Sequence, residues 1–213
     1  PGQISGQLSI DENLSCLIDT SEQTPANWKV RLNSSNYTLF ATTDNSGHYE
    51  IADIPGDDYL LSAVFPSNLW ESCPDDIPVS IQDTGAVTIS QDLPIQVITD
   101  CPFMTLDIST FGLRRCFPST YNVHYCNSGT IAADSAYITI QLDPLLDLNS
   151  ASIPFTQSGD TLYFSLGSMA SLECGDFSFN VTVNCDSAQL GQTLCVSAAI
   201  FPDTICNPPS NWS

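Results

Sequence analysis

The sequence predicts an all-β protein built from two tandem β-sandwich domains. Apolar and polar residues alternate over short stretches, which is the pattern of antiparallel strands with one buried face. Glycine, proline, asparagine and aspartate separate these stretches at short intervals, as turns do in sandwiches. The 213 residues, of which 42% are hydrophobic, suffice for two ordinary cores.

Five stretches show the alternation clearly, and each places its apolar residues on one face of an expected strand. They are Trp28/Val30/Leu32, Tyr59/Leu61/Ala63/Phe65, Tyr121/Val123/Tyr125, Ile138/Ile140/Leu142 and Phe177/Phe179/Val181/Val183. In the first stretch Lys29 and Arg31 occupy the opposite, solvent-facing side. No internal isopeptide bond from Lys29 is expected, because that reaction needs a lysine inside an apolar core.

The segment 92–102 is too apolar for a flexible linker, so we expect it to contain the last strand of the first domain. This places the boundary near residue 99 and gives domains 1–98 and 99–213. The prolines at 208 and 209 predict an extended C-terminal tail over residues 206–213. Earlier in the chain, residues 44–47 and the pair Pro55 and Gly56 predict tight turns, the latter of type II.

The charge balance excludes several classes of partner. Four basic residues oppose 24 acidic ones, for a net charge of −20. Such a surface repels nucleic acid and anionic membranes, because it cannot neutralise phosphates. No apolar segment is long enough for membrane insertion, and no signal peptide is present. A mature exported protein or a segment of a longer one fits this sequence.

Nine dispersed cysteines, without a CxxC pair and with only two histidines, predict disulfides rather than a zinc site. Disulfides imply an extracellular or cell-surface location. Cys16 and Cys73 are the only cysteines of the first domain and are expected to pair. The second domain holds the other seven, whose connectivity the sequence leaves open: Cys101, Cys116, Cys126, Cys174, Cys185, Cys195 and Cys206.

Local spacing in the second domain favours Cys116 with Cys126, and Cys174 with Cys185 or Cys195. The odd cysteine is then expected at an end of the domain, at Cys101 or Cys206. A bond to a neighbouring subunit and a buried free thiol both remain open for it.

The stretch 11–22, DENLSCLIDTSE, has the ligand spacing of a calcium loop. Its candidate ligands are Asp11, Asn13, Ser15, the carbonyl of Leu17, Asp19 and a bidentate Glu22. Cys16 stands where such loops usually carry glycine in a left-handed conformation. The alternative is an acidic loop held by a disulfide, with water in place of Ca²⁺.

No catalytic residues are predicted. His48 and His124 alternate with apolar residues and are expected as surface positions on strands, and a G-x-S-x-G elbow is absent. Arg114 and Arg115 form the only basic pair, which fits either a structural anchor or a docking point for an acidic neighbour. Asn-x-Ser/Thr sequons, which matter only if the source organism glycosylates asparagine, occur at Asn13, Asn33, Asn36, Asn180 and Asn211.

Residues 4–98 resemble the B-type repeats of serine-aspartate-repeat and collagen-adhesin stalks of bacterial surface proteins. The resemblance rests on the order of the acidic loop, WKVRL at 28–32, TDNSGHY at 43–49 and PGDDY at 55–59. It implies a prealbumin-like sandwich without enzymatic activity. The family often holds calcium at the acidic loop, which supports the metal interpretation.

Residues 100–206 resemble an immunoglobulin-like repeat of large secreted adhesins and extracellular fibre proteins. The matching pieces are YNVHYCNSGT at 121–130, LDP at 142–144 and GDTLYFSLG at 159–167. The two resemblances together imply tandem immunoglobulin-like/prealbumin-like sandwiches that serve as a structural module of an extracellular bacterial fibre or stalk.

The expected partners of such a module are copies of itself or neighbouring repeats, joined end to end. The joint is expected to use an exposed strand edge or an extended terminus such as residues 1–10. The alternative function is a ligand-binding adhesin for carbohydrate or protein, with Trp70 and Trp212 as exposed contacts. A hydrolase, such as a glycosidase with paired carboxylates, is a more distant third.

Overall fold

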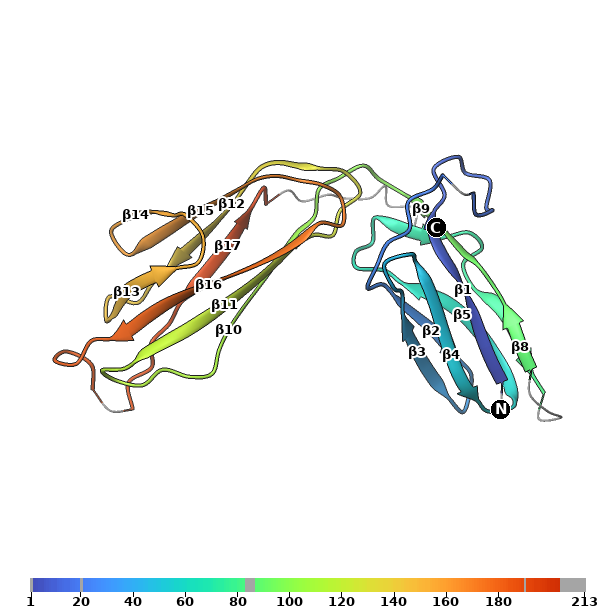
Figure 1. The fold of residues 1–213 in the computed structure, drawn as a ribbon, viewed down its shortest axis with the longest axis horizontal. Helices are drawn as coiled ribbons and strands as arrows, with labels where there is room; N and C mark the ends of the chain where they lie inside the picture. The colour runs from blue at the N-terminus through green and yellow to red at the C-terminus, as the bar shows by residue number, and fades with distance from the viewer. Residues whose placement is uncertain (1, 20, 83–86, 190, 204–213) are drawn as a thin grey trace, which may run out of the picture. The chain divides into compact units, whose positions relative to one another are not determined.

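Every regular element of the described residues is a β-strand, as the sequence predicts (Figure 1). The computed structural model describes residues 2–19, 21–82, 87–189 and 191–203. The strands of the first part are β1 (Gly2–Ile10), β2 (Lys29–Asn33), β3 (Thr38–Thr42), β4 (His48–Ile54), β5 (Asp57–Val64), β6 (Trp70–Ser72), β7 (Ile77–Ile81), β8 (Val87–Ser90) and β9 (Leu93–Val97). Those of the second part are β10 (Met104–Thr110), β11 (Pro118–Asn127), β12 (Ala133–Gln141), β13 (Leu146–Ala151), β14 (Thr156–Ser158), β15 (Thr161–Met169), β16 (Cys174–Val183) and β17 (Ser197–Phe201).

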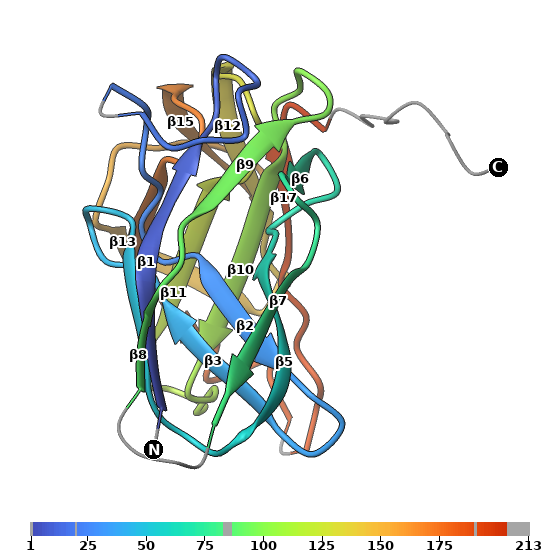
Figure 2. The same cartoon turned by 90° about the vertical axis from the view of Figure 1, so that its right-hand side faces the viewer.

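The strands form two compact units that divide between Asp100 and Cys101. In the first unit, one sheet has the order β4-β1-β9-β6 with β8 also paired to β1, and the other has the order β3-β2-β5-β7. Strand β1 pairs antiparallel with β4. It pairs parallel with β8 and β9 (Figure 2). The expected last strand of this unit is β9, which lies inside the segment 92–102.

The position of β1 corrects the expectation that residues 1–10 are donated to a neighbouring molecule. Ile4 and Leu8 on this strand have no exposed surface and belong to the core. Because β1 pairs with three strands of its own unit, it has no free edge along the paired residues. Releasing it would unfold the unit rather than free a connector.

The core of the first unit follows the predicted alternation. Val30 and Leu32 on β2 are fully buried, whereas Lys29 and Arg31 are exposed. Trp70 is 3% exposed, and its ring meets that of Trp28 edge-on at 5.2 Å. The expectation of Trp70 as an exposed ligand contact is therefore wrong, because its apolar ring completes the core beside Trp28.

The second unit is a sandwich of two four-stranded sheets, β10-β11-β16-β13 and β14-β15-β12-β17. Its core is formed by the apolar faces that the sequence indicates on the strands that became β11, β12 and β16. The buried residues include Val123, Ile138, Ile140, Phe177, Phe179, Val181 and Val183. Tyr121 stacks on Phe179 with ring centroids 5.0 Å apart across the two neighbouring strands.

The two turns predicted in the first unit differ in outcome. At residues 44–47 the Gly47 N–H donates to the Asp44 carbonyl over 3.0 Å, and Gly47 has a φ of +72°. A type II turn at Pro55 and Gly56 would need a positive φ at the glycine. The positive φ lies instead at Asp53, at +54°, so β4 and β5 are joined by a different bend.

None of the described residues forms a helix that could cross a membrane. The C-terminal tail 206–213, with Cys206, Asn211 and Trp212, lies outside the described residues.

Candidate functional site

The acidic loop follows β1 and folds around the carboxylate of Asp11, which is 2% exposed. The backbone N–H groups of Ser15 and Cys16 donate to it over 3.0 and 2.8 Å. The side-chain amide of Gln96, on β9, donates over 2.7 Å. The loop is thereby fixed to the end of the sheet that contains β1 and β9.

Hydrogen bonds also set the ionisation of Asp11. Burial by itself raises the pKa of this carboxyl group. The hydrogen bonds from Gln96 and from the backbone N–H groups of Cys16, Ser15 and Leu14 outweigh burial, so its pKa is lowered from 3.8. Asp11 is therefore a carboxylate at neutral pH, able to accept N–H groups or to bind a cation.

Cys16 adopts the left-handed conformation that the sixth position of a calcium loop requires, with a φ of +57°. Leu14 does so as well, at +58°. Cys16 forms a disulfide with Cys73, with their Cα atoms 5.2 Å apart. The bond ties the loop to the end of β6, 57 residues away along the chain.

The remaining candidate ligands make hydrogen bonds within the loop. Asn13 Nδ2 donates to Asp19 Oδ2 over 2.6 Å, and Ser15 Oγ donates to the Leu17 carbonyl over 3.3 Å. Glu22 Oε2 accepts from Ser9 Oγ over 2.9 Å. The other oxygen, Glu22 Oε1, is buried without a hydrogen-bond partner.

These oxygens suit calcium in kind and number, and the orphaned Glu22 Oε1 is a place for a cation. The candidate ligands are not, however, gathered around one point. Among the described residues, only His124, Cys126 and Cys174 form a group of three ligand-type side chains with atoms within 4.8 Å of one another. Asp11, Asp19 and Glu22 are not gathered in this way, so their carboxylates would have to come closer together to bind one Ca²⁺ ion.

The disulfides of the second unit differ from those that local spacing favours. Cys116 bonds to Cys185, and Cys126 bonds to Cys174. The reason is the sheet register: β11 and β16 are antiparallel neighbours, which places Cys126 directly opposite Cys174. Both pairs join residues that are distant in sequence, 69 and 48 positions apart.

The free cysteine among the described residues is Cys195, which is exposed. Cys101, one of the two positions expected to hold the odd thiol, is disulfide-bonded. The expectation followed from position at a domain end, whereas pairing is decided by which strands lie side by side.

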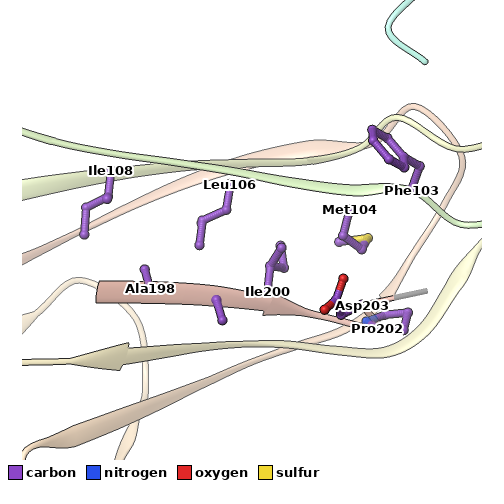
Figure 3. Close-up of a pocket in the computed structure, with 9 residues that line it drawn as sticks. Phe103, Met104, Leu106, Ile108, Ala198, Ile200, Pro202 and Asp203 are labelled. Atoms are coloured by element: carbon purple, nitrogen blue, oxygen red, sulfur yellow. The ribbon is translucent and has the colours of Figure 1, made fainter. Parts of the chain in front are cut away.

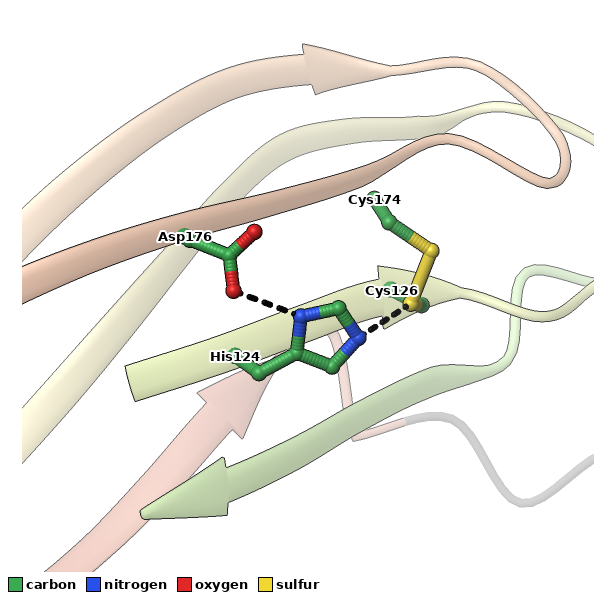
Figure 4. Close-up of polar contacts among 4 residues, drawn as sticks. All are labelled: His124, Cys126, Cys174 and Asp176. Carbon is green, nitrogen blue, oxygen red and sulfur yellow. Dashed lines mark hydrogen bonds and ion pairs between the residues drawn. A yellow bond between two sulfur atoms is a disulfide. The ribbon is translucent and has the colours of Figure 1, made fainter. Parts of the chain in front are cut away.

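His124 lies on the exposed face of β11, as predicted, but in a setting that the sequence analysis missed (Figure 4). Its Nδ1 is 2.7 Å from Asp176 Oδ1, and its Nε2 is 3.3 Å from Cys126 Sγ. The signals in the sequence are His124, two residues before Cys126, and Asp176, two residues after Cys174. Only the β11–β16 register shows that the two pairs face each other.

Asn127 is a second polar residue whose role only the fold reveals. It is fully buried, and its Nδ2 donates to the carbonyls of Ile131, Met169 and Ala170 over 2.8–3.2 Å. Its Oδ1 accepts the N–H groups of Phe103 and Gly129, both over 3.1 Å. One side chain thus satisfies backbone groups from three separate segments.

An apolar groove of about 310 Å³ lies between the edge strands β10 and β17 of the second unit (Figure 3). Leu106 and Ile108 line it from β10, and Ala198 and Ile200 line it from β17. Each strand pairs with one neighbour, β11 and β12 respectively. The groove is therefore flanked by two sheet edges in the described chain.

The other predicted positions are placed as follows. His48 and Lys29 are exposed. Arg115 Nε donates to the Cys185 carbonyl over 2.8 Å, and the Arg114 guanidinium lies 4.3 Å from the Phe117 ring centroid. Both arginines therefore make structural contacts within the second unit. Among the described asparagines of the sequons, Asn180 is half-buried. The other three are exposed: Asn13, Asn33 and Asn36.

No protein-family model and no curated protein matches this chain. Among solved structures, it is similar to BcpA, the major pilin subunit of Bacillus cereus, at 10% identity and a TM-score of 0.39, over 93% of this chain and 63% of that one. It is similar to the full-length major pilin SpaD of Corynebacterium diphtheriae at 11% identity and a TM-score of 0.39, over 93% and 61%. A glycoside hydrolase family 20 exo-β-N-acetylglucosaminidase of Vibrio harveyi matches 38% of this chain and 13% of its own, at 17% identity and a TM-score of 0.32. The chain thus spans less than two thirds of the pilin structures that it resembles.

Proposed function

We propose that this chain is a non-enzymatic structural module of an extracellular fibre or stalk, joined end to end to copies of itself or to neighbouring repeats. The observation that carries the proposal is that each unit is a β-sandwich closed by disulfides between residues far apart in sequence. Such bonds form and persist in an oxidising compartment, which supports a location at or beyond the cell surface.

The disulfides suit a module that bears tension. The bond between Cys16 and Cys73 spans 57 residues. Without this bond, a force that unfolds the unit would extend these residues to about 190 Å. The bond between Cys116 and Cys185 spans 69 residues of the second unit and encloses the bond between Cys126 and Cys174. A pulling force therefore cannot draw out most of either sandwich without breaking a covalent bond.

The apolar groove between β10 and β17 supports end-to-end joining. An extended strand of a second copy would pair with a sheet edge and place its apolar side chains against Leu106 and Ile200. The edges of β10 and β17 that are unpaired among the described residues supply the backbone groups for such pairing.

Replacing Ala198 by glutamate is expected to shorten or abolish fibres seen by negative-stain electron microscopy. Ala198 lines the groove, and a carboxylate there would be desolvated by an incoming apolar strand. Ser197→Glu is the matched control, because it adds the same charge on the same strand at an exposed position that does not line the groove. Fibres of normal length from a folded Ala198→Glu variant would exclude this joint.

The acidic loop is proposed as a calcium site that stiffens the first unit. Asp11, Asn13, Ser15, the Leu17 carbonyl, Asp19 and Glu22 would hold the ion, and the unpartnered Glu22 Oε1 supports this assignment. Hydrogen bonds and the disulfide hold Asp11 and Cys16 in place without it. The ion would add stability rather than create the fold.

Calcium added to metal-stripped protein is expected to raise the melting temperature of the first unit. A Ca²⁺ concentration one hundred times the dissociation constant adds about 2.7 kcal/mol to the free energy of unfolding. For a domain of this size, this raises the melting temperature by roughly 10 °C or more. Differential scanning calorimetry with and without Ca²⁺ measures this, with Glu22→Gln as the variant that loses the effect. An unchanged melting temperature would leave a disulfide-held loop without a metal.

A ligand-binding adhesin remains the second candidate because of one surface feature. Tyr137, Phe155 and Tyr163 line a hollow of about 320 Å³ on the second unit, and their side chains are 37–42% exposed. Exposed aromatic rings in a hollow suit the apolar faces of sugars. Single particles in the microscope, together with a glycan-array signal that Tyr163→Ala removes, would favour this function over a fibre module.

A further inference from the structure

Four side chains with reactive or ionisable groups lie together on the solvent-facing side of the β11–β16 pair (Figure 4). His124 is opposite Asp176, and Cys126 is opposite Cys174, in an uninterrupted antiparallel register. Residues two apart on a strand share a face, so the cross-strand disulfide and the His–Asp pair are neighbours. The side chains of His124 and Asp176 are 54% and 76% exposed, so solutes reach this cluster.

The imidazole is positioned between a carboxylate and a sulfur. A protonated His124 donates from Nδ1 to Asp176 Oδ1 over 2.7 Å and points Nε2–H at Cys126 Sγ, 3.3 Å away. The carboxylate holds the ring in this orientation. The two sulfurs also differ in access, because Cys174 is exposed and Cys126 is half-buried. An incoming thiol therefore meets Cys174, and the sulfur that would leave is the one beside His124.

The chain also carries a free thiol, on the exposed Cys195, which lies at the other end of the second unit. The backbone N–H of Cys195 donates to Asp143 Oδ2 over 3.4 Å, and its neighbour Leu194 lines the same hollow as Tyr121, which places Cys195 near Tyr121. Tyr121 is five residues before Cys126 on β11, or about 17 Å along the strand. Cys195 is therefore too far from Cys174 of its own chain to attack it.

We propose that the Cys126–Cys174 disulfide is a thiol–disulfide exchange site that links copies of this chain covalently, with His124 as the proton donor. The Cys195 thiolate of a second copy, formed by loss of its proton to solvent, attacks Cys174 Sγ. The Cys195–Cys174 bond forms as the Cys126–Cys174 bond breaks, and the electron pair of the broken bond goes to Cys126 Sγ. That sulfur takes the proton from His124 Nε2, and the imidazole regains a proton from solvent.

The exchange needs no oxidant, because one disulfide replaces another. Each linked copy loses the thiol at Cys195 and gains one at Cys126, so the number of free thiols per chain does not change. Among the described residues each copy has one free thiol, Cys195, and one disulfide beside a histidine, which makes the linkage head-to-tail. This linkage rests on the proposed fibre function for its role, whereas the reactivity of the Cys126–Cys174 bond does not.

The reactivity is tested on the full chain with reduced glutathione as the thiol, followed by acid quenching, alkylation and peptide mapping. Glutathione is expected on Cys174 and the alkyl group on Cys126, at a rate well above that of the Cys116–Cys185 disulfide, which has the Arg115 side chain but no described histidine contact. His124→Gln is expected to slow the reaction by about tenfold or more. His48→Gln, the same change at an exposed strand histidine of the other unit, should leave the rate unchanged.

A pH profile separates proton donation from a structural role. The rate per glutathione thiolate is expected to depend on pH in the wild-type chain, where the imidazole supplies the proton, and to stay level in His124→Gln. Glutathione attached to Cys126 instead of Cys174, or equal rates and profiles for the two chains, would overturn the assignment.

The link between copies is tested by non-reducing electrophoresis and mapping of concentrated protein. A peptide joining Cys195 to Cys174 is expected, and Cys195→Ser should abolish it. Exchange of Cys195 with the Cys116–Cys185 bond of its own chain would contradict the inference. Fibres in the microscope without the Cys195–Cys174 peptide would overturn the covalent link and leave the fibre function standing. Chains joined by this peptide that form no fibres would overturn the fibre function and leave the covalent link standing.

Discussion

Replacing both Cys16 and Cys73 by serine is expected to lower the free energy of unfolding of the first unit by about 4 kcal/mol. The bond closes a loop of 57 residues, and the chain-entropy model assigns this stabilisation to the loop that it removes from the unfolded ensemble. The melting temperature of the unit should fall by roughly 20 °C. Differential scanning calorimetry resolves this as a shift of one transition.

The second unit serves as the internal reference for that experiment, because the two units have separate cores and separate disulfides. Its transition should keep its temperature. Cys195→Ser is the control for loss of a cysteine as such, because that thiol is free and exposed. A shift of the first transition by only one or two degrees would mean that the hydrogen bonds to Asp11 already hold the loop in place.

Asn127→Ala is expected to destabilise the second unit by about 3 kcal/mol. The substitution leaves the carbonyls of Ile131, Met169 and Ala170 and two backbone N–H groups without their partner. Each buried polar group that stays unsatisfied costs roughly 1–3 kcal/mol, and some of these groups will regain water. Urea unfolding followed by circular dichroism measures the loss in the free energy of unfolding.

Asn122→Ala is the matched control for this prediction. Asn122 lies on the same strand, β11, but its side chain is exposed, so its loss should change stability by less than about 0.5 kcal/mol. Equal effects of the two substitutions would show that Asn127 acts through strand propensity and not through its buried hydrogen bonds.

The fold class could be predicted from the sequence because each strand carries its own evidence. On β2, Val30 and Leu32 are buried while Lys29 and Arg31 are exposed, and this division follows from the two-residue period of a strand alone. The sequence also marked Cys16 as the position where calcium loops usually carry a left-handed glycine, and the structure gives this cysteine a φ of +57°. These are local properties, set by neighbours along the chain.

The sequence by itself therefore determined the two sandwiches, the pairing of the only two cysteines in the first one, and the surface positions of His48 and His124. The tertiary structure alone decided that Cys126 meets Cys174, that His124 lies between Asp176 and a disulfide sulfur, and that Asn127 joins three segments. The same distinction explains why Trp70 is buried and why the described residues of β1 are paired with three strands of their own unit. The physical reason is that an alternating pattern specifies which face of a strand is buried, whereas its neighbours and register depend on how all the strands of both sheets pack together.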